Sequence, residues 1–366
     1  MIRHLVFDNI VYALQHFGGI SVVWYELQKR MQAESKMELH YIDVDEQRQR
    51  ENYNRNQLTI AREDVLWTIK HHRWARYMPV TSLKMDAPFI FHSSYYRYCT
   101  HPKAINITTV HDFTYEHFIH GIKQKVHSWQ KFSAIRHSAY TVCISENTKR
   151  DLLNFLPDLD ESRVRVIYNG VSEVFRKLQD SPNANDLPFP PHSYVVFIGR
   201  RDSYKNFDLV VNAVAQTNLN LVIIGRKLDE SETKKLEQSI PAERYCSLNG
   251  VFDEQLNFIY NYAAALVYPS SYEGFGLPVL EAQRAGCPVI ALKASSIPEV
   301  IGSTPLLMST LSVSEMVDKL RLLSDKDLMC QVIADGMKNS NRFSWQRMAD
   351  EYLQLYQSIG NASVPV

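Results

Sequence analysis

Cysteine is scarce in this chain, with five residues among 366 that are far apart and odd in number. Disulfide frameworks and cysteine zinc sites depend on closely spaced cysteines. We therefore expect reduced thiols in a cytoplasmic protein, and neither a disulfide framework nor a zinc site. The chain also lacks an apolar run near the ~20 residues that a membrane span requires. Residues 1–8 are interpreted as a buried strand rather than a signal peptide, because polar residues follow at once.

Net charge is absent as well, since 40 Lys and Arg balance 40 Asp and Glu. Positions 1–172 hold 22 basic and 18 acidic residues, and twelve of the thirteen histidines lie in the first half. This excess is too small to indicate nucleic-acid binding, but it fits an anionic acceptor or membrane surface. The length allows two domains of ordinary size.

Residues 264–289 predict a strand, a loop with two glycines and a short helix. Pro278 suits the first helical position, and Gly286 suits a left-handed stop after the helix. Glycines let the backbone approach a ligand, and a helix N-terminus attracts anions. Glu273 and Glu281 bracket this loop with carboxylates that can accept hydrogen bonds from hydroxyls. The segment indicates a ligand that is both phosphate and sugar; the alternative is a tight turn with two solvated glutamates.

The pattern Glu-Gly-Phe-Gly-Leu-Pro-x-Leu-Glu-Ala at residues 273–282 resembles the signature of the retaining GT-B glycosyltransferases of family 4. The resemblance extends over most of the chain. It implies an α/β GT-B fold, with two Rossmann-like doubly wound domains facing across a cleft. It also implies a metal-independent, retaining transfer of a hexose from a nucleotide-diphosphate sugar. By analogy, the acceptor is a glycan or lipid-linked, in bacterial surface-polysaccharide synthesis such as that of O-antigen, lipopolysaccharide or capsule.

Strands and helices alternate in two successive series, which predicts two parallel sheets. In the first series we expect a strand at 38–44, a helix at 117–139, a helix that Ser145 caps at its N-terminus, and a last strand at 164–171. We expect an N-terminal acceptor-side domain at residues 1–171 and a proline-rich linker at 172–193. A C-terminal nucleotide-sugar-binding domain follows at 194–342. The resemblance implies that the last helix, at 343–366, crosses back to the first domain.

Two features of the first half fit a donor site. Gly18 and Gly19 precede a helix, and the resemblance implies that this loop closes over the donor diphosphate. His111 follows the predicted strand 106–110, at the end where open α/β sheets bind ligands. One interpretation is a structural histidine whose ring is hydrogen-bonded within the protein. The resemblance implies instead that His111 reaches the transferred sugar.

In the second half, Arg200 and Lys205 follow the predicted strand 194–198, and Arg226 follows the strand 219–224. Arginine offers phosphate oxygens a planar fork and lysine a point charge, so we expect a cationic pocket. The alternative is surface charge on a loop. Asn249 lies where the family places the nucleobase.

By resemblance, Glu281 holds the ribose and Glu273 the sugar. The predicted catalytic residues are His111, Glu273, Arg200 and Lys205. The predicted donor-binding residues are Gly18, Gly19, Gly199, Arg226, Asn249, Phe275, Gly276, Leu277, Pro278, Val279 and Glu281. No cofactor or metal is expected beyond a UDP- or GDP-linked donor. The alternative from another class is a non-catalytic sugar-phosphate or glycan-binding protein on a GT-B frame.

Three remaining segments carry weaker patterns. Asp43 and Asp45 form an Asp-x-Asp, which we interpret as structural because the rest of the chain matches a fold that does not use this motif. Residues 46–64 are polar and predict a mobile loop or lid. Residues 65–80 predict a basic helix with interleaved aromatics. It either lies on an anionic bilayer, at the inner face of the cytoplasmic membrane, or packs with a solvated basic face.

Overall fold

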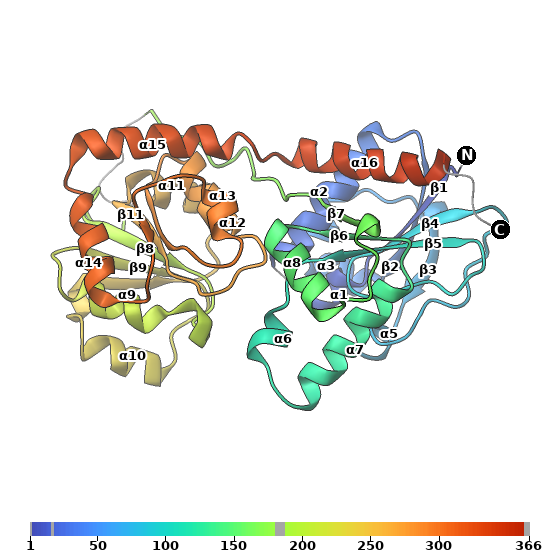
Figure 1. Cartoon of the computed structure of the whole chain (residues 1–366), viewed down its shortest axis with the longest axis horizontal. Helices are drawn as coiled ribbons and strands as arrows, with labels where there is room; N and C mark the ends of the chain where they lie inside the picture. Colours follow the sequence, from blue (N-terminus) through green and yellow to red (C-terminus); the bar gives the residue numbers. More distant parts are fainter. Residues whose placement is uncertain (1, 16–17, 180–186, 362–366) are drawn as a thin grey trace. The chain divides into compact units, whose positions relative to one another are not determined.

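The computed structural model describes residues 2–15, 18–179 and 187–361, and the chain forms two compact units (Figure 1). One unit is Met1–Gly170 together with the chain from Ser344 onward, and the other is Val171–Phe343. We call them unit 1 and unit 2. Each contains one parallel sheet with helices packed against it. The expected α/β architecture with two parallel sheets is therefore confirmed.

The sheet of unit 1 has seven strands in the order β3-β2-β1-β4-β5-β6-β7. Its strands are β1 (His4–Asp8), β2 (Glu38–Val44), β3 (Val65–Ile69), β4 (Phe89–Ser93), β5 (Ala104–Val110), β6 (Tyr140–Cys143) and β7 (Val164–Val166). Its helices are α1 (Val11–Leu14), α2 (Gly19–Glu34), α3 (Glu46–Glu51), α4 (Tyr53–Asn56), η1 (Arg62–Asp64), α5 (His72–Ala75), α6 (Thr114–Phe118), α7 (Ile122–Arg136), α8 (Glu146–Phe155), η2 (Glu161–Arg163) and α16 (Trp345–Asn361).

The sheet of unit 2 has six strands in the order β10-β9-β8-β11-β12-β13. Its strands are β8 (Tyr194–Ile198), β9 (Asn220–Ile224), β10 (Tyr245–Leu248), β11 (Ala265–Tyr268), β12 (Val289–Leu292) and β13 (Leu307–Met308). Its helices are η4 (Ser203–Lys205), α9 (Phe207–Val214), α10 (Glu230–Glu237), η5 (Ala242–Arg244), α11 (Asp253–Tyr262), α12 (Leu277–Arg284), α13 (Ile297–Ile301), α14 (Val313–Leu322) and α15 (Lys326–Ser340).

Both sheets reverse their strand order beside the first strand of the unit, between β1 and β4 and between β8 and β11. Strands such as β11 and β12 are buried on both faces, which explains their continuous apolar sequences. Open α/β sheets bind ligands in the crevice outside the carboxyl ends of strands at such a reversal. The loops after β8 and β11 occupy this position in unit 2.

Several local predictions are confirmed. The strands predicted at 38–44 and 194–198 have those bounds. The Ser145 side chain caps α8 by accepting a hydrogen bond from the Thr148 amide. Gly286 has φ +77° just past α12, as expected for a left-handed stop. Pro278 takes the second rather than the first position of α12, because the helix begins at Leu277.

The prediction of a mobile loop at 46–64 is wrong. This segment forms α3, α4 and η1, and Arg55 within it is buried. Its guanidinium binds the buried Asp43 carboxylate, with 2.9 Å between Nε and Oδ2. Asp45 accepts a hydrogen bond from the Arg48 amide and caps α3. Both aspartates thus have structural partners, in agreement with our interpretation of the Asp-x-Asp pattern.

The helix predicted at 65–80 is also wrong. The segment begins as the edge strand β3 and continues into α5, a single turn of four residues. The predicted helix at 117–139 is divided into α6 and α7, with Gly121 at φ +82° before α7. The last strand of the first half ends at Val166 rather than Val171. Part of the predicted linker, residues 180–186, lies outside the described residues.

The terminal helix α16 packs into unit 1. The Tyr356 hydroxyl lies 2.7 Å from His92 Nδ1, and the Tyr352 hydroxyl lies 2.9 Å from Thr109 Oγ1. The chain leaves unit 1 after Gly170 and re-enters this unit at Ser344, next to Gly170. A Cβ atom at Gly170 would lie 2.1 Å from the Trp345 nitrogen, so only glycine fits at this crossing.

Candidate functional site

A partly buried ion pair lies at the centre of the candidate site of unit 2. Lys205 Nζ lies 2.5 Å from Glu273 Oε1, and the two side chains are 12% and 13% exposed. The Tyr268 hydroxyl also hydrogen-bonds to Glu273, and the ammonium group lies 5.3 Å from the centre of the Tyr268 ring. The loops after β8 and β11 therefore place one cation and one carboxylate together.

Asn206 holds these two loops together, and sequence analysis missed this residue. It has the left-handed conformation, with φ +54°, between η4 and α9. Its side-chain amide donates to the Pro269 carbonyl at 2.7 Å and to Ser271 Oγ at 2.8 Å. The Ser271 amide in turn donates to the Tyr204 carbonyl. Asparagine directly after Lys205 was the available signal, because asparagine tolerates φ above zero.

Two serines brace the glycine loop from the other side. Ser295 Oγ accepts from the Glu273 amide, and Ser296 Oγ donates to the carbonyls of Glu273 and Phe275 at 2.9 Å each. Gly276 has φ +102°, and a Cβ atom there would lie 2.9 Å from Ile297 Cδ1. The loop is thus fixed before α12, whose N-terminus provides the positive end of a helix dipole.

The arginines of the site differ in their surroundings. The Arg200 side chain is 79% exposed and pairs with Asp202 at 3.1 Å. The neighbouring Arg201 is 1% exposed and binds Glu232, whose other partner is Arg226. The expected cationic pocket is therefore not formed by all three predicted cations: Lys205 binds Glu273, whereas Arg226 belongs to a cluster with Glu232.

The remaining predicted donor-binding residues lie near the same sheet edge. Gly199 follows β8 with φ +123°, and Asn249 is exposed directly after β10. Phe275 is buried against Phe343, with 5.7 Å between ring centres. Within the first turn of α12, Leu277 and Pro278 are partly buried and Val279 is fully buried.

Glu281 lies one turn into α12 and is partly buried. Burial raises the pKa of its carboxyl group to about 8, and the nearby Asp253 carboxylate adds to the shift. A carboxyl group with this pKa is largely protonated at neutral pH. Its conversion to a carboxylate is favoured by any ligand that donates hydrogen bonds to it.

We predict that Glu281→Gln stabilises the ligand-free protein more at pH 8 than at pH 5. In the unfolded chain this carboxyl ionises near pH 4.5, but in the folded chain it ionises near pH 8. Between these values the unfolded state binds fewer protons, so the stability of the wild type falls as pH rises. Glutamine does not ionise, so the variant does not lose stability in this way as pH rises. Unfolding temperatures of both proteins at pH 5 and pH 8 test the effect, and an equal difference at both values would contradict it.

In unit 1, His111 directly follows β5 and is 7% exposed. Burial lowers its pKa to about 4; Asp112 opposes the shift and Lys131 adds to it. The imidazole is therefore neutral at physiological pH. It is suited to a hydrogen bond with a neutral hydroxyl rather than to pairing with an anion.

A buried lysine supports the loop that carries His111. Lys131 on α7 is fully buried, and its Nζ donates to the Asp112 carbonyl at 2.8 Å and to Glu116 Oε2 at 2.6 Å. Ser128 Oγ donates to the other oxygen of Glu116 at 2.7 Å. The position of His111 thus depends on α6 and α7, a relation that no local sequence pattern reveals.

The second glycine pair lies at the N-terminus of α2, as the sequence suggested. Gly18 is the residue before the helix, and its carbonyl accepts a hydrogen bond from Ser21 Oγ at 2.8 Å. Asn54 on α4 in turn donates to Ser21 at 3.0 Å. The segment mistaken for a lid therefore buttresses this helix start.

Two parallel sheets with glycine loops and helix N-termini at their carboxyl edges are typical of GT-B proteins. Residues 17–174 match the family model named Glycosyltransferase Family 4, and residues 183–339 match the model named Glycosyl transferases group 1. The chain is therefore a GT-B protein that carries two glycosyltransferase domains, one mainly in each unit.

The chain is also similar to individual proteins. It is 36% identical over 113 residues to an O-antigen chain mannosyltransferase B from Escherichia coli, covering 31% of this chain and 30% of that protein. It is 27% identical over 241 residues to a D-inositol 3-phosphate glycosyltransferase from Corynebacterium efficiens, covering 60% of this chain and 57% of that one. The chain thus spans less than two thirds of the length of these curated relatives.

Solved structures share the fold over nearly the whole chain. Sucrose-phosphate synthase from Thermosynechococcus elongatus has a TM-score of 0.73 at 17% identity, covering 99% of this chain and 100% of that one. Anabaena HepE in complex with UDP and glucose has a TM-score of 0.70 at 15% identity, covering 98% and 100%. At these identities the likeness establishes the fold alone.

Proposed function

We propose that this protein is a retaining glycosyltransferase that moves a hexose from a UDP- or GDP-linked donor to a glycan or lipid-linked acceptor. The partly buried pair of Lys205 and Glu273 carries the proposal, because it places a cation and a carboxylate beside the N-terminus of α12. A cation and helix dipole suit a diphosphate, and a carboxylate suits sugar hydroxyls. The mannosyltransferase relative favours mannose and a role in O-antigen or a similar surface polysaccharide.

The proposed chemistry is electrostatic. As the glycosidic bond breaks, negative charge grows on the leaving diphosphate, and fixed positive groups stabilise it. In unit 2, Lys205 and the helix N-terminus at Leu277 would supply this charge, and Glu281 would bind the ribose. In unit 1, the helix N-terminus at Gly19 is suited to a diphosphate, and the neutral imidazole of His111 is suited to a sugar hydroxyl. Retention follows in this proposal from attack on the same face as the departing phosphate.

A thermal-shift panel tests the proposed donor. A ligand at about 100 times its dissociation constant stabilises a protein by about 2.7 kcal/mol, which a melting curve detects. UDP, GDP, ADP and their hexose conjugates should separate by nucleobase, and a mannosyl donor should rank among the strongest. Absence of any shift at millimolar nucleotide would contradict a nucleotide-sugar site.

We predict that transfer survives EDTA. Positive charge at the site comes from side chains and helix ends, and Asp43 is already bound to Arg55 within unit 1. The measurement is nucleotide release from the donor with and without chelator. Loss of turnover in EDTA, restored by Mg²⁺ or Mn²⁺, would return the Asp-x-Asp segment to consideration and contradict this mechanism.

The second part of the proposal is that an exposed surface of unit 1 binds an anionic membrane. Trp74 in α5 is 78% exposed, and Ile122 and Trp129 on α7 are 81% and 62% exposed. The two segments adjoin, because Gln130 donates a hydrogen bond to the Arg76 carbonyl. Exposed apolar groups beside basic side chains suit the surface of an anionic bilayer, where a lipid-linked acceptor would reside. Among the described residues, no helix is long and apolar enough to span a membrane.

We predict that anionic liposomes bind this surface more strongly than neutral ones. Each Lys or Arg near an anionic surface contributes about 1 kcal/mol. A variant with Lys70 and Arg73 changed to Ser and Trp74 changed to Ser should pellet less with anionic liposomes. Arg76 is left intact because it packs over the Tyr95 ring.

The matched control changes the exposed Lys36 and Lys84 of the same unit to Ser. This control has the same charge as the first variant but keeps the surface around Trp74. Equal pelleting of the two variants and the wild type would remove membrane binding from the proposal.

A further inference from the structure

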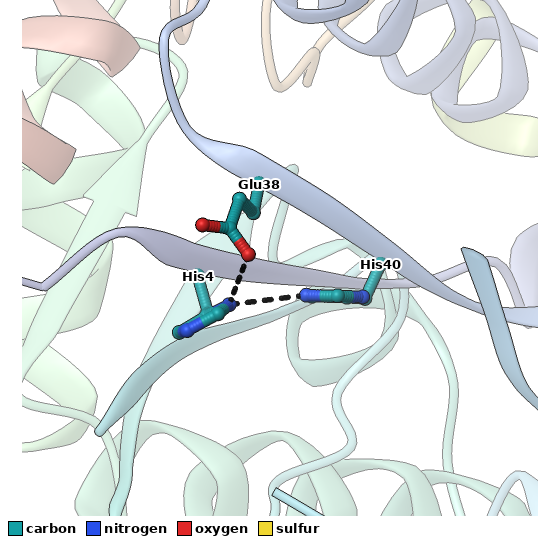
Figure 2. A group of neighbouring side chains, drawn as sticks. All are labelled: His4, Glu38 and His40. Carbon is teal, nitrogen blue, oxygen red and sulfur yellow. Dashed lines mark hydrogen bonds and ion pairs between the residues drawn. The ribbon is translucent and has the colours of Figure 1, made fainter. Parts of the chain in front are cut away.

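A group of three potential metal ligands lies at the amino ends of two neighbouring strands of unit 1. His4 is the first residue of β1, and Glu38 and His40 are the first and third residues of β2 (Figure 2). The parallel register pairs His4 with Glu38 and Val6 with His40. Because side chains alternate between faces, all three project from the same face of the sheet.

The distances between these side chains fit a shared cation. His4 Nδ1 lies 3.2 Å from His40 Nε2 and 3.3 Å from Glu38 Oε2. The three ligand atoms all lie within 4.8 Å of one another. Zinc binds nitrogen and oxygen at about 2.0–2.2 Å in tetrahedral geometry, which places two ligand atoms about 3.3 Å apart. The two shortest separations therefore already match this spacing.

Hydrogen bonding alone satisfies the group less well. His4 Nδ1 is close to both His40 Nε2 and Glu38 Oε2, as Figure 2 shows, but a neutral ring nitrogen carries at most one hydrogen. A proton on His4 Nδ1 can be donated along only one of the two directions. A cation between the three atoms accepts a lone pair from each of them at once.

We propose that His4, Glu38 and His40 form a binding site for a divalent transition metal, with Zn²⁺ as the fitting ion. Two imidazoles and one carboxylate match the ligands that zinc takes in proteins with three side-chain ligands. Glu38 is 61% exposed, so solvent completes the coordination. The site lies at the amino ends of β1 and β2, whereas the proposed donor loops follow the carboxyl ends of strands. The ion would therefore join the starts of these strands and take no part in transfer.

No metal site was expected from the sequence, because neither the cysteines nor the Asp-x-Asp pattern indicated one. The three ligands come from two strands, and His4 and His40 are 36 positions apart in the sequence. A single histidine at the start of a strand has no recognisable spacing. Only the strand register brings them together.

Equilibrium dialysis against micromolar Zn²⁺, with the metal-free full-length protein, tests the proposal. We expect one bound zinc per chain. His4→Ala and His40→Ala should each weaken binding at least about tenfold, because a tridentate site loses one of its ligands. Glu38→Gln keeps the size and hydrogen bonding of the side chain and should also weaken binding. The exposed His120 provides the control, and His120→Ala should bind zinc as the wild type does.

Thermal unfolding with and without Zn²⁺ separates binding at this site from a folding defect. The wild type and His120→Ala should melt several degrees higher with zinc, and His4→Ala and His40→Ala should show no such shift. Substitution by Co²⁺ provides a spectroscopic measurement, since four-coordinate cobalt absorbs strongly in the visible. Zinc binding that is equally strong in His4→Ala, His40→Ala and the wild type, or no binding by the wild type at 100 µM zinc or less, would overturn the proposal.

Discussion

Replacing Lys205 by alanine should lower turnover by about 10²–10³, the usual effect of removing one preorganised charge that stabilises a transition state. The side chain is 12% exposed and fixed against Glu273 and two tyrosine rings, so it needs little reorganisation when charge develops on the leaving phosphate. The measurement is the rate of nucleotide release at saturating donor. Lys205→Arg keeps the charge and should retain part of the activity.

The control for this prediction is the exposed Lys227, which follows β9 in the same unit. Lys227→Ala should leave turnover within about twofold of the wild type. Because Lys205→Ala leaves Glu273 without its cation, the unfolding temperature must be measured as well. Near-full turnover of a folded Lys205→Ala protein would contradict the phosphate assignment. Arg200→Ala should also lower turnover, although the side chain is 79% exposed before donor binds.

The two glutamates of the glycine loop should differ in their kinetic effects. Glu273→Gln should lower kcat, because the transferred sugar gains positive charge in the transition state and a carboxylate interacts with it more strongly there. Glu281→Gln should raise KM and leave kcat largely unchanged, because a ribose contact is nearly equal in the ground and transition states. Each effect should reach about tenfold or more, the change that a difference of 1.4 kcal/mol produces.

Glutamine keeps the size and part of the hydrogen bonding of glutamate. Glu273→Gln therefore mainly removes charge, whereas Glu281→Gln mainly removes the ability to ionise when a ligand donates hydrogen bonds to this group. The two substitutions also serve as controls for each other, because they make the same chemical change at the two ends of one segment, residues 273–281. Loss of kcat in Glu281→Gln at unchanged KM, together with weaker binding alone in Glu273→Gln, would reverse the two roles.

Short-range patterns were sufficient to predict most of the sheet strands. Strands such as β2 and β8 combine apolar runs with polar residues at their carboxyl ends, and these features act locally. The segment after Glu46 was mispredicted because its polarity resembles that of a loop. Its helices are stabilised instead by a buried ion pair between Arg55 and Asp43. The run at β3 is five residues long, which is too short to distinguish a strand from part of a helix.

The candidate site was predictable only in part. Glu273 and Lys205 were each predicted as site residues from their positions after strands, but their contact spans 68 residues and is seen only in the fold. Adjacent arginines cannot be distinguished by spacing, and the structure buries Arg201 while exposing Arg200. The supports of the site, Asn206, Ser295 and Ser296, act through backbone carbonyls and amides, which leave no recognisable pattern in a single sequence.

The proposed function requires that this chain turns over a nucleotide sugar rather than merely binding one. The most direct measurement follows release of nucleoside diphosphate from UDP- and GDP-linked hexoses, with a glycan or lipid-linked acceptor present, and compares the wild type with Glu273→Gln. The account predicts release with one class of donor by the wild type, and at least tenfold slower release by the variant. Donor binding by both proteins with no release above that of a protein-free control, across the donors and acceptors tested, would contradict the account and favour a non-catalytic binding protein.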